Sequence, residues 1–405
     1  MVLLQLVASV LIRALAALSW TAGAFTALFS VASVLAVRRL WKERKAAAGR
    51  VPAALPPVTV LKPIKGLDRE MYASLASFLD QDYPEYQVIF CVQDADDAAL
   101  PLLRRLKADF PERDVELVVS SERIGFNPKV NNLANAEPAI KHELLLISDS
   151  DVRARRDCLR RLVEPMADPE VGLVTSFYVS RGSRTLGAAL EALSVNAQFL
   201  PQAAVAGVWG GMRFAMGAVM LVRRGAFEAL GGFASLSAYL ADDYRLGRAV
   251  QRAGQRIAFA DALVASVPDA WPLLDHLSHM LRWARTVRVC QAGGYRASLL
   301  LQGAALLFVR ACLPGGGDAA RAFCALSLLR GLCVAWSHWA YLDNPDIVRE
   351  ILFLPLSELA QFAVWLAGLR AAKVVWRGER YRVLSDGRLV LDRAKTPALE
   401  LALAA

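Results

Sequence analysis

The sequence predicts an α/β protein in which a sheet domain covered by helices is joined to membrane-embedded segments. Between residues 58 and 148, apolar runs alternate with helical patterns, which is typical of a parallel sheet with helices on both faces. Hydrophobic residues make up 56% of the chain and charged residues 21%. This combination fits neither an ordinary soluble enzyme nor a pure membrane bundle. Long apolar segments near the amino terminus and beyond residue 295 account for the high hydrophobicity.

The amino-terminal segment, residues 1–45, is predicted to be a membrane anchor. Residues 14–37 are uncharged and mostly apolar, and as a helix they would be about 36 Å long, enough to span a bilayer. Basic residues follow at positions 38, 39, 42, 44 and 45, whereas only Arg13 precedes the segment. The positive-inside rule then places the chain after residue 38 in the cytoplasm. A secretory signal would instead carry positive charge before a shorter apolar run.

A cytoplasmic domain is predicted over residues 50–292, with its ligands at one edge of the sheet. Strands are expected within the segments 58–66, 86–97, 115–120 and 144–147. In open α/β sheets, ligands bind beyond the carboxyl ends of the strands. The candidate residues at these ends are Lys62, Asp94, Asp149 and Asp151.

Asp149 and Asp151 are the candidate metal ligands. They directly follow an apolar run, and in extended backbone residues i and i+2 point the same way. Mg²⁺ or Mn²⁺, which takes oxygen ligands and bridges to phosphates, suits such a pair. A solvated strand-to-loop turn is the alternative, because Asp and Ser are common turn residues.

Asp94 and Lys129 are candidates for binding a phosphorylated ligand. Asp94 could accept hydrogen bonds from a nucleobase or a ribose at the sheet edge, or it could be a turn acid. Lys129, in the segment NPKVNNL, could neutralise a diphosphate as a point charge, or it could be a surface lysine.

Asp242 and Asp243 stand near the start of a helix predicted over residues 238–250. Carboxylates at that position suit the helix dipole and need no further function. Asp243 could also act as a general base that accepts a proton from an acceptor hydroxyl. The two interpretations are compatible.

A basic helix predicted over residues 276–289 carries His279, Arg282 and Trp283 on one face, because they are spaced i, i+3 and i+4. A guanidinium suits a phosphate, and an indole suits a sugar or an acceptor. The alternative is a basic helix resting on lipid headgroups. A zinc site at His276 and His279 lacks an evident third ligand nearby.

Residues 295–372 are predicted to form membrane segments, approximately 297–313, 322–342 and 351–369. The tail, residues 373–405, is basic near its start, which favours the cytoplasmic side. Because three full crossings would place this tail outside, two segments are expected to cross and one to be interfacial or re-entrant. The Ala/Leu-rich stretch 185–208, interrupted by Pro201, is expected to be a helix lying against the membrane interface.

The net charge of +9 is not arranged as an aromatic-basic stripe, so nucleic acid is not the expected partner. The basic residues lie next to apolar segments, which favours anionic lipid headgroups and phosphorylated substrates. The six cysteines show neither C-x-x-C nor zinc-like spacing, so a reducing compartment is expected. The fingerprints of P-loop ATPases, dinucleotide-binding dehydrogenases and serine hydrolases are not found at the strand ends.

Taken in order, these motifs resemble the family 2-type glycosyltransferases with a GT-A fold, and more closely the ceramide glucosyltransferase-like family (family 2/21). The resemblance covers almost the whole chain, from VTVLKPIKGLD through NPKVNNL and LADDY to RGERYRV. Bacterial glycosyltransferases of the hopanoid pathway share a similar pattern. The key acids of the family fall on Asp94, Asp149 and Asp243, and its Gln/Arg-x-x-Arg-Trp motif falls on residues 279–283. His279 departs from that motif, and Asp151 completes a D-x-D that eukaryotic members reduce to D-S-G.

The resemblance implies an inverting hexosyltransferase that moves a sugar from a UDP-sugar, expected to be UDP-glucose, to the hydroxyl of a membrane lipid, expected to be ceramide. It implies Mg²⁺ or Mn²⁺ on Asp149 and Asp151, with Asp243 as the base. The donor is expected to contact Lys62, Asp94, Lys129, Asp149, Arg282 and Trp283, while Asp242 and His279 face the acceptor or the diphosphate.

The expected setting is an integral multi-pass protein of a bacterial inner membrane, with its active site facing the cytoplasm and no obligate protein partner. Hopanoid or diacylglycerol acceptors remain alternatives, as does a processive polysaccharide synthase, although a translocation channel would need more spans. A membrane scaffold with a degenerate sheet domain is the non-enzyme alternative.

Overall fold

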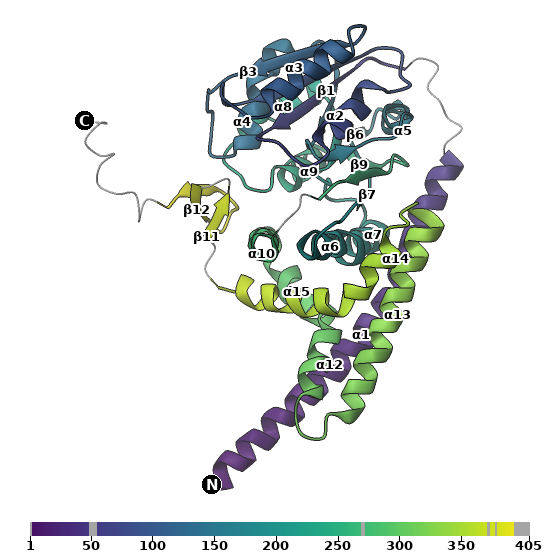
Figure 1. The fold of residues 1–405 in the computed structure, drawn as a ribbon, viewed down its shortest axis with the longest axis vertical. Coiled ribbons are helices and arrows are strands. Elements are labelled where there is room, and N and C mark those ends of the chain that lie inside the picture. The colour runs from purple at the N-terminus through teal and green to yellow at the C-terminus, as the bar shows by residue number, and fades with distance from the viewer. Residues whose placement is uncertain (1, 48–54, 269–271, 371–372, 377–378, 393–405) are drawn as a thin grey trace, which may run out of the picture.

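The computed structural model describes residues 2–47, 55–268, 272–370, 373–376 and 379–392. Figure 1 shows a sheet domain at one end and an elongated stem of helices at the other, with the amino terminus at the tip of the stem. The helices between these two parts are α6 (Leu186–Leu193), α7 (Leu200–Gly210), α10 (Leu273–Cys290) and α15 (Leu354–Gly368).

The sheet domain is built on seven strands in the order β3-β2-β1-β4-β8-β6-β9. The first four strands along the chain pair in parallel, which confirms the parallel sheet predicted for residues 58–148. β8 runs antiparallel to both β4 and β6, so the complete sheet is mixed. The strands are β1 (Val58–Ile64), β2 (Tyr86–Val92), β3 (Asp114–Val119), β4 (Leu144–Ser148), β6 (Val171–Thr175), β8 (Val219–Arg223) and β9 (Arg256–Phe259).

Helices cover both faces of this sheet, and every residue of β1, β2 and β4 is therefore buried. Successive side chains point to opposite faces, so Val60 and Leu61 belong to different core clusters. One face packs against α2 (Met71–Leu79), α3 (Leu100–Asp109) and α5 (Cys158–Val163), and the other against α4 (Pro128–Asn135), α8 (Arg224–Ala229) and α9 (Asp242–Arg252).

A small second sheet joins the main sheet to the helices below it. Its strands are β5 (Val152–Arg153), β10 (Val264–Ser266) and β7 (Tyr178–Ser180). The predicted helix over 185–208 is present as α6, a π-helical turn over Ser194–Phe199, and α7. Pro201 is the second residue of α7 and directly follows the π-helical turn.

The stem contains α1 (Val2–Ala47), α12 (Gly303–Ala311) and α13 (Gly317–Tyr341), which run alongside one another (Figure 1). Among the described residues, three helices are long and apolar enough to cross a membrane, over 5–43, 317–341 and 347–368. A pair over 292–301 and 303–311, bent by 51°, would make a fourth if it formed one span. The pair includes α11 (Ala292–Ala297), and the 347–368 helix includes α14 (Ile347–Glu350).

These elements confirm the predicted fold class, with apolar helices at both ends of an α/β domain. The last of them, α15, runs across the axis of the stem beside α10 (Figure 1). That direction is the one expected of an interfacial segment, while the number of crossings stays a prediction.

The tail from residue 373, predicted only to be basic and cytoplasmic, includes a third sheet. Its antiparallel strands are β11 (Lys373–Trp376), β12 (Glu379–Val383) and β13 (Leu389–Leu391). Apolar side chains of β12 and β13 pack against Leu240, directly before α9. A bridge between Tyr239 and Arg388 joins this sheet to the same loop. The described part of the tail, up to residue 392, is therefore folded onto the sheet domain.

Candidate active site

A cavity of about 1050 Å³ lies beyond the carboxyl ends of β1, β2 and β4. Its walls come from α4, α6, α9, α10 and the small sheets as well as from these strand ends. All the predicted site residues except Lys62 line it, namely Asp94, Lys129, Asp149, Asp151, Asp242, Asp243, His279, Arg282 and Trp283. The topology thus gathers residues that are up to 189 positions apart in sequence, since Asp94 and Trp283 share the cavity.

Lys62 lies behind the cavity wall and is fully buried. Its Nζ donates to Ser148 Oγ at 3.0 Å and to the Asp149 carbonyl at 2.9 Å, and it sits 3.4 Å from the centre of the Phe78 ring. Burial lowers the pKa of Lys62 to about 7, although Asp149 and Asp151 oppose this shift. The side chain therefore holds the end of β4 in place from within the core, whereas the sequence prediction gave it a donor contact.

Lys129 forms the centre of a charge network between two acidic elements. It lies in the first turn of α4, whose N-cap Asn127 accepts a hydrogen bond from the Val130 N–H at 3.1 Å. Lys129 Nζ is 2.7 Å from Asp149 Oδ1 and 3.5 Å from Asp242 Oδ2. Burial alone would lower the pKa of Lys129, but these carboxylates raise it overall. Lys129 is thus a permanent cation between the end of β4 and the start of α9.

Asp151 is the more buried member of the candidate metal pair. Its Oδ2 accepts a hydrogen bond from Ser266 Oγ at 2.6 Å, across the pairing of β5 with β10. Burial, followed by the nearby charge of Asp149, raises the pKa of Asp151 to about 6. The intervening Ser150 donates to Asp68 Oδ2 at 2.8 Å. These bonds fix the turn that carries both carboxylates.

Asp149 and Asp151 suit a divalent metal ion that binds together with a diphosphate better than a metal ion that the protein holds by itself. Within the described part of the chain, no group of three or more His, Cys, Asp or Glu side chains is arranged to hold a metal. Mg²⁺ is commonly bound by one or two carboxylates, while water and substrate phosphates complete its coordination. Asp149 and Asp151, which both line the cavity, supply that incomplete oxygen set.

Asp243 lines the same cavity from the first turn of α9. Its Oδ1 accepts a hydrogen bond from the Tyr244 N–H at 2.7 Å. Burial, followed by the charge of Asp242, raises the pKa of Asp243 to about 6, and Lys129 opposes the shift. A Cβ at Gly217 would come within 3.0 Å of Asp243 Oδ2, so a glycine there leaves room for the carboxylate. The raised pKa suits a group that must take up a proton near neutral pH.

The remaining wall is aromatic and polar, and α10 supplies most of it. The ring of Trp283 lies 5.2 Å from that of His279 and 6.3 Å from that of Phe199, centre to centre. Burial, with help from Arg282 and His276, lowers the pKa of His279 to about 4, against the opposing charge of Glu191. A neutral imidazole therefore stands where the family motif has Gln or Arg.

Asp94 follows the end of β2 and lines the cavity. Its side chain is 45% exposed and forms an ion pair with Lys65 at the end of β1. The loop after β1, which carries Lys65, is tied to the loop after β2 by Asp97. Both oxygens of the Asp97 carboxylate accept the Gly66 N–H at 3.0 Å. Asp94 thus lies at the rim, where a bulky ligand could reach it.

Sequence reasoning missed Tyr381 and Leu391, which line the cavity from the carboxyl-terminal sheet. Tyr381 is 2% exposed, and its ring meets that of Phe126 edge to face at 6.4 Å. A signal was available, because Asp386-Gly387 separates two short apolar-alternating runs and Asp-Gly is a strong hairpin signal. Glu191 was also missed; it lines the cavity from α6 and its Oε2 lies 2.9 Å from His276 Nδ1.

The chain is similar to known glycosyltransferases. Residues 24–389 match the family model described as Glycosyl transferase family 21. Ceramide glucosyltransferase 1 of Caenorhabditis elegans is 25% identical over 345 residues, which are 83% of this chain and 73% of that protein. Ceramide glucosyltransferase 3 of the same organism is 27% identical over 234 residues, or 58% of this chain. The match spans about half, 51%, of the length of that relative.

Among solved structures, the fold is similar to a mannosyltransferase from Pyrobaculum calidifontis in complex with GDP-Man and Mn²⁺. The TM-score is 0.52 at 20% sequence identity, and the match covers 87% of this chain and 97% of the other. At this identity the likeness establishes the fold.

Proposed function

Because the chain belongs to glycosyl transferase family 21, we propose that it transfers glucose from UDP-glucose to the primary hydroxyl of ceramide in a membrane, with inversion. The observation that carries the proposal is that acidic residues from two different elements line one cavity and have a lysine between them. Asp149 and Asp151 follow β4, Asp243 lies in the first turn of α9, and Lys129 lies close to both elements. An inverting transfer needs such a division between a leaving-group site and a base.

The strand-end side of the cavity would bind the donor. Asp94 at the rim would accept hydrogen bonds from the uridine. A divalent ion held by Asp149 and Asp151 would supply positive charge to the diphosphate. Lys129 and Arg282 would stabilise the negative charge that develops on the departing UDP. Trp283 and Phe199 offer an apolar wall for the sugar or the lipid.

The α9 side would activate the acceptor. The hydroxyl oxygen of the lipid attacks the anomeric carbon from the face opposite UDP, and its proton passes to Asp243. The bond between the anomeric carbon and the phosphate oxygen breaks, and its electron pair leaves with UDP. Atoms and charges balance, because UDP carries away the negative charge while Asp243 takes the proton.

A lipid acceptor also suits the place of the cavity in the molecule. Helices α6, α7 and α10 lie between the sheet domain and the stem (Figure 1), and residues of α6 and α10 line the cavity. The chain is a membrane protein by its apolar helices. We place it as a multi-pass protein of a bacterial inner membrane with the cavity on the cytoplasmic side, since basic residues follow the first apolar segment.

Product analysis tests the proposal. Purified protein reconstituted in lipid with Mn²⁺ would be offered UDP-glucose, UDP-galactose, UDP-GlcNAc and UDP-glucuronate with ceramide, diacylglycerol or a hopanoid, and products would be identified by mass. We expect glucosylceramide from the wild type. Asp243→Asn keeps a hydrogen-bond acceptor for the Tyr244 N–H, so it should fold and bind UDP-glucose but form no product.

The matched control is Asp275→Asn, an exposed acid in the first turn of α10 that lies outside the cavity. It should retain wild-type turnover. A polymeric product would instead favour a processive synthase. Failure to form a glycolipid from every donor and acceptor pair would refute the enzyme proposal.

A further inference from the structure

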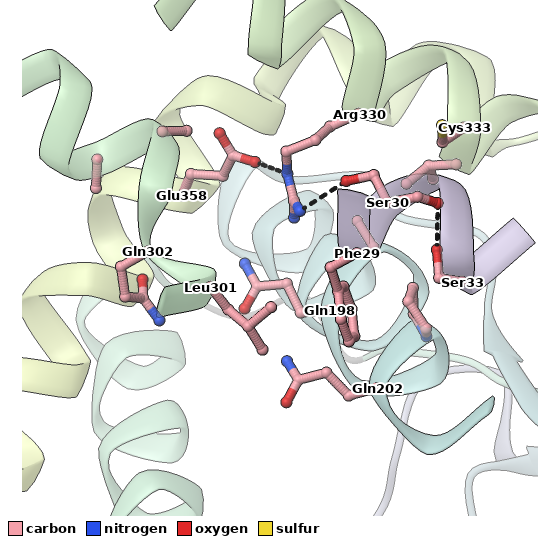
Figure 2. A pocket seen from close by; sticks show the side chains of 15 residues that line it. Phe29, Ser30, Ser33, Gln198, Gln202, Leu301, Gln302, Arg330, Cys333 and Glu358 are labelled. Atoms are coloured by element: carbon pink, nitrogen blue, oxygen red, sulfur yellow. Dashed lines mark hydrogen bonds and ion pairs between the residues drawn. The ribbon is translucent and has the colours of Figure 1, made fainter. Parts of the chain in front are cut away.

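A second cavity, of about 40 Å³, lies inside the stem. It is formed where α1, α12, α13 and α15 meet the π-helical turn before α7 (Figure 2). We call it the stem chamber. Although its walls come from apolar helices, seven serine, glutamine and charged side chains line it among the described residues: Ser30, Ser33, Gln198, Gln202, Gln302, Arg330 and Glu358.

The inner end of the stem chamber is an ion pair with one hydrogen-bond acceptor left over. Arg330 Nε donates to Glu358 Oε1, and Arg330 Nη1 donates to Ser30 Oγ at 3.4 Å (Figure 2). Arg330 and Glu358 are 9% and 6% exposed. The second carboxylate oxygen, Glu358 Oε2, is buried and receives no hydrogen bond within the described part of the protein. Buried polar atoms in proteins nearly always form a hydrogen bond, so a ligand that donates one to this oxygen would be stabilised here.

Glutamine side chains in the wall of the stem chamber also have amides available for hydrogen bonds with a ligand. Gln198 and Gln202 lie one helical turn apart, and Figure 2 shows Gln198 beside the guanidinium of Arg330. Across the described residues, no hydrogen bond from the side-chain amides of Gln198, Gln202 or Gln302 to the protein is found. Gln202 is exposed, so it marks the outer end of the chamber, whereas Glu358 marks the inner end.

The charges of the stem chamber select for an uncharged ligand. Glu358 already neutralises Arg330, and no other cation is found among the described residues that line the chamber. A phosphate would meet a carboxylate without a free positive charge, while a hydroxyl or amide N–H can donate to Glu358 Oε2 and accept from the glutamine amides. The volume holds about three water-sized groups, which suits a hydroxyl with an amide rather than a phosphate ester.

The surroundings of the stem chamber are those of a membrane-facing surface. Leu28 of α1 and Leu332 of α13, on helices that carry the chamber, are 72% and 60% exposed. Both helices are among the candidate membrane spans. A ligand with its polar end in the chamber would therefore have hydrocarbon beside it, as the tails of a lipid require.

We propose that the stem chamber binds the uncharged hydroxyl- and amide-bearing head of a membrane lipid, which donates a hydrogen bond to Glu358 Oε2. The chamber is separate from the active-site cavity. Val195 and Phe199 line the large cavity, whereas Gln198 and Gln202 of the same helical segment line the chamber. Lipid binding there requires neither a nucleotide sugar nor transfer, so it can be measured whether or not the proposed function is correct.

Photolabelling of the full-length protein tests this site. The protein would be placed in phosphatidylcholine nanodiscs with a small fraction of a ceramide that carries a diazirine near its head, and labelled peptides would be identified by mass. Label is expected on chamber residues of α7, α12 or α13. A diazirine-bearing phosphatidylglycerol, whose head is anionic, should not label them.

Two variants separate hydrogen bonding from folding. Glu358→Gln keeps an oxygen for Arg330 and turns the free acceptor into a donor, and Gln198→Leu removes one amide without touching the ion pair. Each should lower labelling of the chamber by about fivefold, the effect of one hydrogen bond. The exposed residues Glu43 and Gln5 of α1 provide matched controls, Glu43→Gln and Gln5→Leu. Undiminished labelling in Gln198→Leu, equal labelling by phosphatidylglycerol, or no label in the wild type would each overturn the proposal.

Discussion

The acid limb of the pH–rate profile should report the ionisation of Asp243. The proposed reaction requires this carboxylate in its charged form, and burial together with Asp242 raises its pKa to about 6. As the pH falls through that value, the base becomes protonated and kcat/KM should fall. At about pH 5 it should be about one tenth of its plateau, whereas an ordinary aspartate would still be about nine tenths ionised.

Two substitutions should move this limb in opposite directions. Asp242→Asn removes a charge that raises the pKa of Asp243, so the limb should move to lower pH. Lys129→Gln removes a cation that lowers the pKa of Asp243, so the limb should move to higher pH. Both variants will also change the plateau, because both side chains line the cavity. The position of the limb separates this effect from a general loss of activity.

The assay is the initial rate of glycolipid formation by reconstituted protein at saturating Mn²⁺. Asp151 also has a pKa raised to about 6, and a bound ion should keep it ionised, which leaves Asp243 as the group that titrates. Asp275→Asn serves as the control and should leave the limb in place. A wild-type midpoint near that of a free aspartate, or shifts in the same direction in the two variants, would refute the assignment of Asp243 as the base.

Three further substitutions test the placement of individual residues. Lys62→Met removes the two hydrogen bonds of a buried lysine and should lower the free energy of unfolding by about 1–3 kcal/mol with little change in donor affinity. Loss of donor affinity without loss of stability would contradict its placement in the core. Gly217→Ala brings a methyl group within 3.0 Å of Asp243 Oδ2 and should reduce kcat about tenfold while the thermal unfolding temperature changes little. Tyr381→Ala removes a wall of the cavity and should raise KM, measured by steady-state rates, whereas Arg382→Ala on the exposed side of β12 should not.

The fold could be predicted because its strongest signals are local. The strand expected within 58–66 is β1 (Val58–Ile64), and the basic helix expected over 276–289 lies within α10. Strand ends that are far apart in sequence could also be expected to meet, since parallel strands place their carboxyl ends at one edge. Asp94 and Asp149 accordingly line one cavity, although their roles stay predictions.

The positions of Lys62 and Tyr381, and the existence of the stem chamber, could not be predicted from the sequence. They depend on the direction of one side chain or on packing between segments that are far apart in the chain. Lys62 lies at an even spacing from Val60 and Ile64, which face the core, so the strand carries it inward. Tyr381 reaches the cavity because a hairpin in the tail packs on Leu240, about 140 residues earlier in the chain. The stem chamber depends on Arg330 and Glu358 meeting across two helices, which no periodicity within either helix specifies.

The anomeric configuration of the product tests the central claim most directly. Proton NMR of the glycolipid formed from UDP-glucose, in which glucose is α-linked, would give the configuration from the coupling of the anomeric proton. The proposed attack on the face of the sugar opposite UDP, with Asp243 as the base, predicts a β-linked product from the wild type and none from Asp243→Asn. An α-linked product, or undiminished product from Asp243→Asn, would contradict the account.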